Sequence, residues 1–150
     1  MIKYSQNNPL YKNFKLGSSD LKVGDYGCTT SCVSTLCSYF GEEKTPGELA
    51  RIKKLYTPSG LIIWNQVGNI YKDVKFFWRY YQFDEKVADD ALLKDPNKAI
   101  MFQVNNRTHW VSALKKNPGS YVCSNPFPFP AQNKTYKHEW ITGMAVLIRK

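Results

Sequence analysis

The segment Gly24–Cys32 constrains this chain most, because a turn-rich approach changes there into an apolar pattern with a helical period. From Cys28 to Phe40, apolar residues and cysteines recur at the spacings of a single helix face. Gly41 follows the last of them and can end a helix in a left-handed conformation. We therefore predict a helix over residues 28–40, with Cys28 at its N-terminus.

The position of Cys28 suggests a chemical role. A helix N-terminus presents unpaired backbone N–H groups and the positive end of the helix dipole, and both stabilise a thiolate. We therefore expect an acidic thiol at Cys28, which would be a nucleophile if a base lies nearby. Cys32 and Cys37 fall on the same helix and are expected to be core thiols that pack as small hydrophobic side chains.

Length and composition favour one globular α+β domain over residues 1–150. The chain is 43% hydrophobic and 15% aromatic, which is typical of a packed core. No apolar run is long enough to span a bilayer, and the first residues show no export signal, so we expect synthesis in the cytoplasm without Sec-type secretion. The four cysteines lack the spacing of a zinc or redox site, so neither a metal nor a cofactor is expected.

The net charge of +9 suggests a polyanionic partner, such as nucleic acid, anionic lipid or an anionic cell-wall polymer. A solvated basic surface that only aids solubility explains the charge equally well. The lysines are scattered singly or in pairs, which argues against specific nucleic-acid binding.

Helices are predicted mainly in the first half of the chain and antiparallel strands in the second, which is an α+β arrangement. Thr45-Pro46-Gly47-Glu48 has the residues of a helix start with a capping box, and the helix is expected to continue to Leu55. His138 lies in a charged, loop-like stretch and is expected to be exposed, with no adjacent partner. The remaining expected elements are a short strand in 1–10, an amphipathic segment over 63–71, a short helix over 85–93, and strands over 74–81, 100–104, 108–114, 121–123 and 144–148.

His109 and Asn125 are predicted to face each other across a hairpin. If the turn over 115–119 is symmetric about Asn117, His109 pairs with Asn125, and cross-strand Cβ atoms lie about 5 Å apart. A one-residue slip would put the two side chains on opposite faces. With Cys28, these residues make a Cys-His-Asn arrangement suited to nucleophilic catalysis. The alternatives are a buried core cysteine and a packed surface histidine, either of which would have no catalytic role.

Short segments along the whole chain together match the motifs of one known family. They are Tyr4-Ser5-Gln6-Asn7-Asn8-Pro9, Lys15-Leu16-Gly17-Ser18-Ser19, Gly27-Cys28 with Ser31, Thr45-Pro46-Gly47-Glu48-Leu49, Leu61-Ile62-Ile63-Trp64, His109-Trp110-Val111 and Tyr121-Val122-Cys123-Ser124-Asn125-Pro126. On these segments the chain resembles, nearly from end to end, the C39-like peptidases of the papain-like cysteine peptidase superfamily.

The resemblance implies a papain-like fold, with N-terminal helices packed on a C-terminal antiparallel sheet. It implies that Cys28 is the nucleophile and that His109 acts first as general base and then as general acid. Asn125 stands where the family usually has Asp, and Asn8 also replaces an Asp of its motif. Gln6 matches a glutamine that we assign, on this resemblance alone, to an oxyanion hole with the Cys28 backbone N–H.

The Tyr-Ser-Gln, Leu-Gly and Gly-Cys segments resemble phage members of the family, which implies a peptidoglycan hydrolase: an endolysin or a virion-associated enzyme acting at the cell wall. Its substrate would be a peptide or peptidoglycan, and its basic surface would attract anionic wall polymers. Two alternatives stay open: a catalytically silent binding or structural module with the same fold, and a peptidase that acts on proteins inside the cell.

Overall fold

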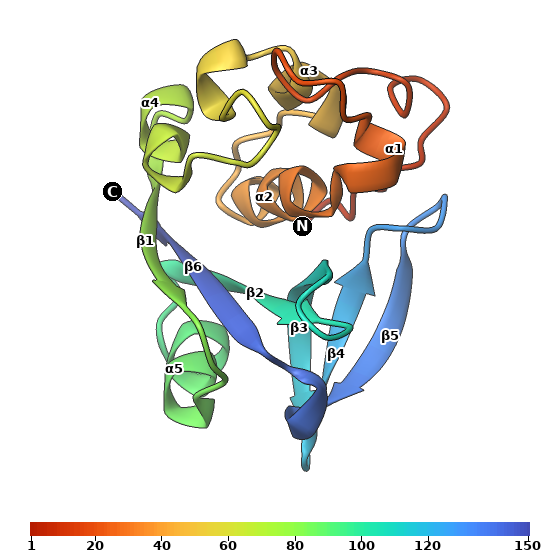
Figure 1. Ribbon diagram of the computed structural model, residues 1–150. Coiled ribbons are helices and arrows are strands. Elements are labelled where there is room, and N and C mark those ends of the chain that lie inside the picture. Colours follow the sequence, from red (N-terminus) through yellow and green to blue (C-terminus); the bar gives the residue numbers. More distant parts are fainter.

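The computed structural model describes residues 1–150, with short helices in the first half and most of the strands in the second (Figure 1). This confirms the predicted α+β class. The helices are α1 (Val23–Tyr26), α2 (Cys28–Tyr39), α3 (Pro46–Ala50), α4 (Val67–Ile70) and α5 (Glu85–Asp89), the last continued by a π-helical turn over Asp90–Lys94; 3₁₀ turns cover Lys53–Leu55, Trp64–Gln66 and His138–Trp140.

Six antiparallel strands form one sheet in the order β1-β6-β2-β3-β4-β5. The strands are β1 (Val74–Tyr80), β2 (Lys98–Val104), β3 (His109–Asn117), β4 (Ser120–Asn125), β5 (Gln132–Lys137) and β6 (Gly143–Arg149). In this order β1 and β5 are the two edge strands, and the C-terminal strand β6 lies between β1 and β2.

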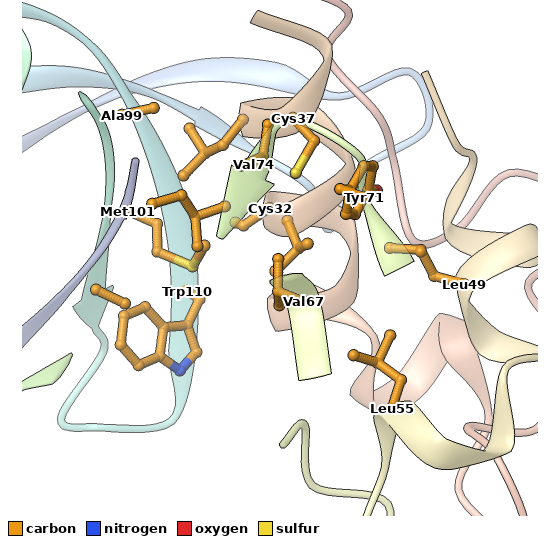
Figure 2. Packing of buried hydrophobic residues seen from close by; sticks show 14 of the residues in the cluster. Cys32, Cys37, Leu49, Leu55, Val67, Tyr71, Val74, Ala99, Met101 and Trp110 are labelled. Atoms are coloured by element: carbon orange, nitrogen blue, oxygen red, sulfur yellow. The ribbon is translucent and has the colours of Figure 1, made fainter. Parts of the chain in front are cut away.

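The helix α2 forms as its pattern predicts and fills the core between the helices and one face of the sheet. It ends at Tyr39, and Gly41 follows with the left-handed φ of +85° that favours glycine. Cys32 and Cys37 are fully buried on it, which confirms them as core thiols. Figure 2 shows them with Met101 and Trp110 from the sheet in one packed cluster.

The other face of the sheet carries a second core. Along β2, Met101 belongs to the α2 side, whereas Ile100 and Phe102 belong to a separate cluster that also contains Ala88 of α5. This alternation follows from the period of two in a strand. The sheet is therefore buried on both faces, and α5 covers the face opposite α2.

Several boundaries differ from the sequence predictions. Residues 1–5 form no strand; hydrogen bonds to a proline-rich loop hold this segment in place instead. Both hydrogen bonds of the capping box between Thr45 and Glu48 are present, but α3 ends at Ala50 and does not continue to Leu55 as predicted. Leu49, Ile52 and Leu55 are spaced by three, a period that also suits the 3₁₀ turn found at Lys53–Leu55.

Strand β5 was not among the predicted elements. Its residues Gln132–Lys137 are polar, and Tyr136 is the only buried residue in it. A hydrophobic pattern cannot reveal such a strand, because an edge strand with one buried side chain has almost no apolar alternation.

Candidate active site

A cavity of about 370 Å³ brings together the four residues that the sequence singled out: Gln6, Cys28, His109 and Asn125. They come from four separate parts of the chain, namely the N-terminal segment, the start of α2, the start of β3 and the end of β4. The cavity is therefore assembled by tertiary packing and belongs to no single local motif.

The backbone at the start of α2 accounts for the Gly-Cys pair. A Cβ atom at Gly27 would lie 2.4 Å from the carbonyl oxygen of Val23, the first residue of α1. Since that distance is too short for any side chain, only glycine allows α1 to run directly into α2. The junction puts Cys28 at the first residue of the longer helix, as predicted.

The pKa of the Cys28 thiol is shifted in the direction opposite to our expectation. Burial raises its pKa above the ordinary value, although backbone N–H groups of Trp110, Thr29 and Cys28 itself oppose the shift. The helix terminus supplies Thr29 and Cys28, and β3 supplies Trp110, but desolvation of the charged form outweighs these donors. No hydrogen bond joins this thiol to the His109 ring; in free enzymes such contacts are often long and tighten in the substrate complex.

His109 and Asn125 form the predicted side-chain pair. The Nε2 atom of His109 lies 2.7 Å from the Oδ1 atom of Asn125, and the backbone N–H of Phe127 donates to the same oxygen at 3.1 Å. An amide oxygen only accepts hydrogen bonds, so His109 carries its hydrogen on Nε2. The lone pair of the neutral ring is therefore on Nδ1, the atom that can take a proton from a thiol.

The environment favours neutral imidazole at His109. Burial lowers its pKa below the ordinary value, the bond to Asn125 opposes this shift, and the nearby charge of Lys134 adds to it. The raised pKa of Cys28 and the lowered pKa of His109 both favour a neutral thiol and a neutral imidazole in the resting site.

Gln6 reaches the cavity because its segment is held by the loop after β4. Its backbone N–H donates to the carbonyl of Pro126 at 2.8 Å, and Ser5 Oγ donates to the carbonyl of Pro128 at 2.6 Å. The buried Gln6 side chain donates from Nε2 to the carbonyl of Gly24 at 3.0 Å, and its Oε1 atom has no hydrogen-bond partner. Nε2 keeps a second hydrogen for another acceptor.

The cavity also contains residues that sequence reasoning did not place there. Lys134 and Tyr136 come from the unpredicted strand β5, and Asp25 and Tyr26 come from α1. Lys134 and Tyr136 are two residues apart, so they share the face of β5 that adjoins Asn125 through the pairing of Asn125 with Gln132. The spacing of two residues would have placed Lys134 and Tyr136 on one face only if the sequence had predicted strand β5.

His138 is not the exposed histidine that we predicted. Its side chain is 23% exposed and lies against the rings of Phe83 and Tyr121, with centroid distances of 4.9 and 5.2 Å. Its Nδ1 atom is 3.6 Å from Glu85, while Nε2 is buried without a partner. The charged sequence around it concealed this packing, because the neighbouring rings come from distant segments.

The described residues include no group of three or more His, Cys, Asp or Glu side chains able to hold a metal ion, and all four cysteines are free thiols. None of the helices is long and apolar enough to cross a lipid bilayer. Comparison with known protein families gives no match, and no curated protein matches the sequence.

Proposed function

We propose that this chain is a cysteine peptidase or amidase with a papain-like fold, which hydrolyses a peptide-type amide through a thioester acyl-enzyme. The observation that carries the proposal is the bond from His109 Nε2 to Asn125. It leaves the Nδ1 lone pair free in the cavity that also contains Cys28. Nucleophile, base and a group that orients the base are the three parts that such catalysis needs.

In the proposed mechanism, His109 Nδ1 takes the thiol proton as Cys28 Sγ attacks the substrate carbonyl carbon. The C=O bond becomes a C–O⁻ bond, which the second Nε2 hydrogen of Gln6 and the Cys28 backbone N–H stabilise. The imidazolium then protonates the leaving amine as the C–N bond breaks. His109 next removes a proton from water, the hydroxide displaces Cys28 from the thioester, and the thiol regains its proton. The neutral resting pair fits this general-base route.

Peptidoglycan is the substrate that we favour, on the resemblance to phage C39-like peptidases. The +9 charge supports this choice, because a basic surface attracts anionic wall polymers. Wall binding of this kind should weaken as salt rises, since exposed charges are screened over about 8–10 Å.

A catalytically silent module is the second candidate, and the raised pKa of Cys28 favours it. Alkylation with iodoacetamide, followed by mass spectrometry, distinguishes the two. A thiol activated by His109 should be alkylated more slowly in the His109→Ala protein. A silent thiol should react at the same rate with or without the histidine.

The direct test is hydrolysis of soluble peptidoglycan fragments by wild type, Cys28→Ser and Cys32→Ser. We expect Cys28→Ser to be inactive and folded, since serine lacks thiolate chemistry. Cys32→Ser is the matched control on the same helix and should lose stability while keeping the chemistry. Activity in Cys28→Ser, or loss of activity in Cys32→Ser without unfolding, would contradict the assignment.

A further inference from the structure

A second cavity, of about 490 Å³, adjoins the candidate active site. Asn105, Lys134 and Tyr136 line both cavities. The second one is completed mainly by Asn106, Glu139 and Trp140. A group bound there would therefore be continuous with a substrate bound at Cys28.

The walls of the second cavity combine an aromatic face with polar, hydrogen-bonding side chains. Trp140 is 47% exposed, and the Lys137 ammonium lies 5.3 Å from its ring centroid. Asn105, Asn106 and Glu139 are exposed and offer amide donors and acceptors and a carboxylate. Tyr136 is buried, and its hydroxyl has no hydrogen-bond partner.

The loop between β2 and β3 contributes Asn105 and Asn106 to the second cavity, and its backbone is strained. Asn105, Asn106 and Arg107 have successive left-handed φ angles of 53°, 55° and 69°. The left-handed region is unfavourable for residues with a side chain, and asparagine tolerates it best of the non-glycine residues. Backbone strain of this kind clusters at ligand clamps. The same loop leads into His109, so it links the second cavity to the base.

We infer that the second cavity is a saccharide subsite, which binds a sugar ring of the substrate beside the amide that Cys28 attacks. This inference rests on the proposed function. A sugar has an apolar C–H face and a rim of hydroxyls, which complement an exposed indole and the amides and carboxylate around it. The cavity volume lies in the range of small-molecule sites. A peptide with alternating side chains would instead add to the free edge of β5.

The first test measures binding without turnover. The Cys28→Ala protein is titrated with tetra-N-acetylchitotetraose, and its intrinsic tryptophan fluorescence is followed. We expect saturable binding that weakens at least tenfold in the Trp140→Ala background. Trp78→Ala is the matched control, because Trp78 is 60% exposed on β1, at the opposite edge of the sheet. Absence of binding, or equal weakening in both variants, would overturn the inference.

The second test compares a soluble muropeptide with the same stem peptide lacking its sugars. Trp140→Ala should lower kcat/KM for the muropeptide at least tenfold. It should leave kcat/KM for the peptide without sugars unchanged. An equal loss on both substrates would mean that the cavity binds peptide, against the inference. If wild type cleaves neither substrate but binds chitotetraose through Trp140, the proposed hydrolase function fails while the saccharide site stands.

Discussion

His109 Nε2 and Asn125 Oδ1 are 2.7 Å apart although their residues are not paired across strands β3 and β4. Near the turn, Asn117 pairs with Ser120; beyond a bulge between Ala113 and Lys115, Ser112 pairs with Ser124. Continuing that register puts Val111 opposite Asn125 and makes His109 its diagonal neighbour. Diagonal neighbours share a face and lie within reach of long side chains. The bulge at Leu114 therefore sets the face on which His109 lies.

Deletion of Leu114 should keep His109 beside Asn125, whereas insertion of one residue into β3 should separate them. Without Leu114, Lys115 would still pair with Val122 and Ala113 with Cys123, so Val111 stays opposite Asn125. An alanine inserted between Ser112 and Ala113 would move each earlier residue of β3 by one position and put His109 and Asn125 on opposite faces. We expect hydrolysis to be kept in the deletion variant and lost in the insertion variant, whose free energy of unfolding should also fall because buried Val111 is displaced. A folded deletion variant without activity, or an insertion variant with full activity, would contradict this role of the register.

The pH dependence of kcat/KM should depend on the residue at position 125. In the proposed mechanism His109 acts as a neutral base. Because burial lowers its pKa, wild-type activity should rise with pH through a midpoint below about 6.5, the ordinary histidine value. Asn125→Asp adds an anion beside the ring, which stabilises the imidazolium form of His109. The midpoint of this rise in activity should therefore move to higher pH.

Two variants control the experiment at position 125. Asn133→Asp adds the same charge on exposed β5, on the face opposite Asn125. It should leave the pH midpoint of the activity profile nearly unchanged. Asn125→Ala should lose activity at every pH, by about 10²-fold, because the ring is no longer held in place. If Asn125→Ala showed the same pH dependence of kcat/KM as wild type, Asn125 would have no role in orienting His109.

Replacement of Gln6 by alanine should lower kcat by about 10²–10³ with little change in KM, as expected for one oxyanion donor. The variant also leaves the Gly24 carbonyl without its donor, which costs about 1–3 kcal/mol of stability. Ser5→Ala removes the neighbouring bond to Pro128 but keeps the Gln6 backbone bond to Pro126, so it should cost stability and lower kcat far less than Gln6→Ala. A change confined to KM would assign Gln6 to substrate binding.

His138 should prove to be structural. Its ring packs on Phe83 and Tyr121, so His138→Ala should lower the free energy of unfolding by about 1–3 kcal/mol. His138→Phe keeps the rings in contact and removes the buried, unpartnered Nε2, so it should be at least as stable as wild type. Chemical denaturation measures both, and hydrolysis should be unchanged in His138→Phe. If the two variants were equally unstable, the contact of Nδ1 with Glu85 would be the important one.

Local sequence predicted the parts of the site that short-range physics controls. The helix of Cys28 follows from its apolar period and from Gly27, and the capping box at Thr45 follows from side chains three residues apart. The side-chain pair of His109 and Asn125 was predicted correctly, although the predicted pairing of the two residues was wrong. The true register differs by two residues at this end, and an even shift preserves the face.

Tertiary structure decided what depends on distant segments. The bulge at Leu114, the strand β5 and the packing of His138 leave no periodic signal in the sequence. The pKa of Cys28 is the clearest case: the sequence puts the thiol at a helix terminus, whose donors lower the pKa, but burial under other segments raises it further than they lower it. Local chemistry therefore determined which groups are available, and desolvation by the fold determined the direction in which their pKa values shift, because burial depends on every segment packed around them.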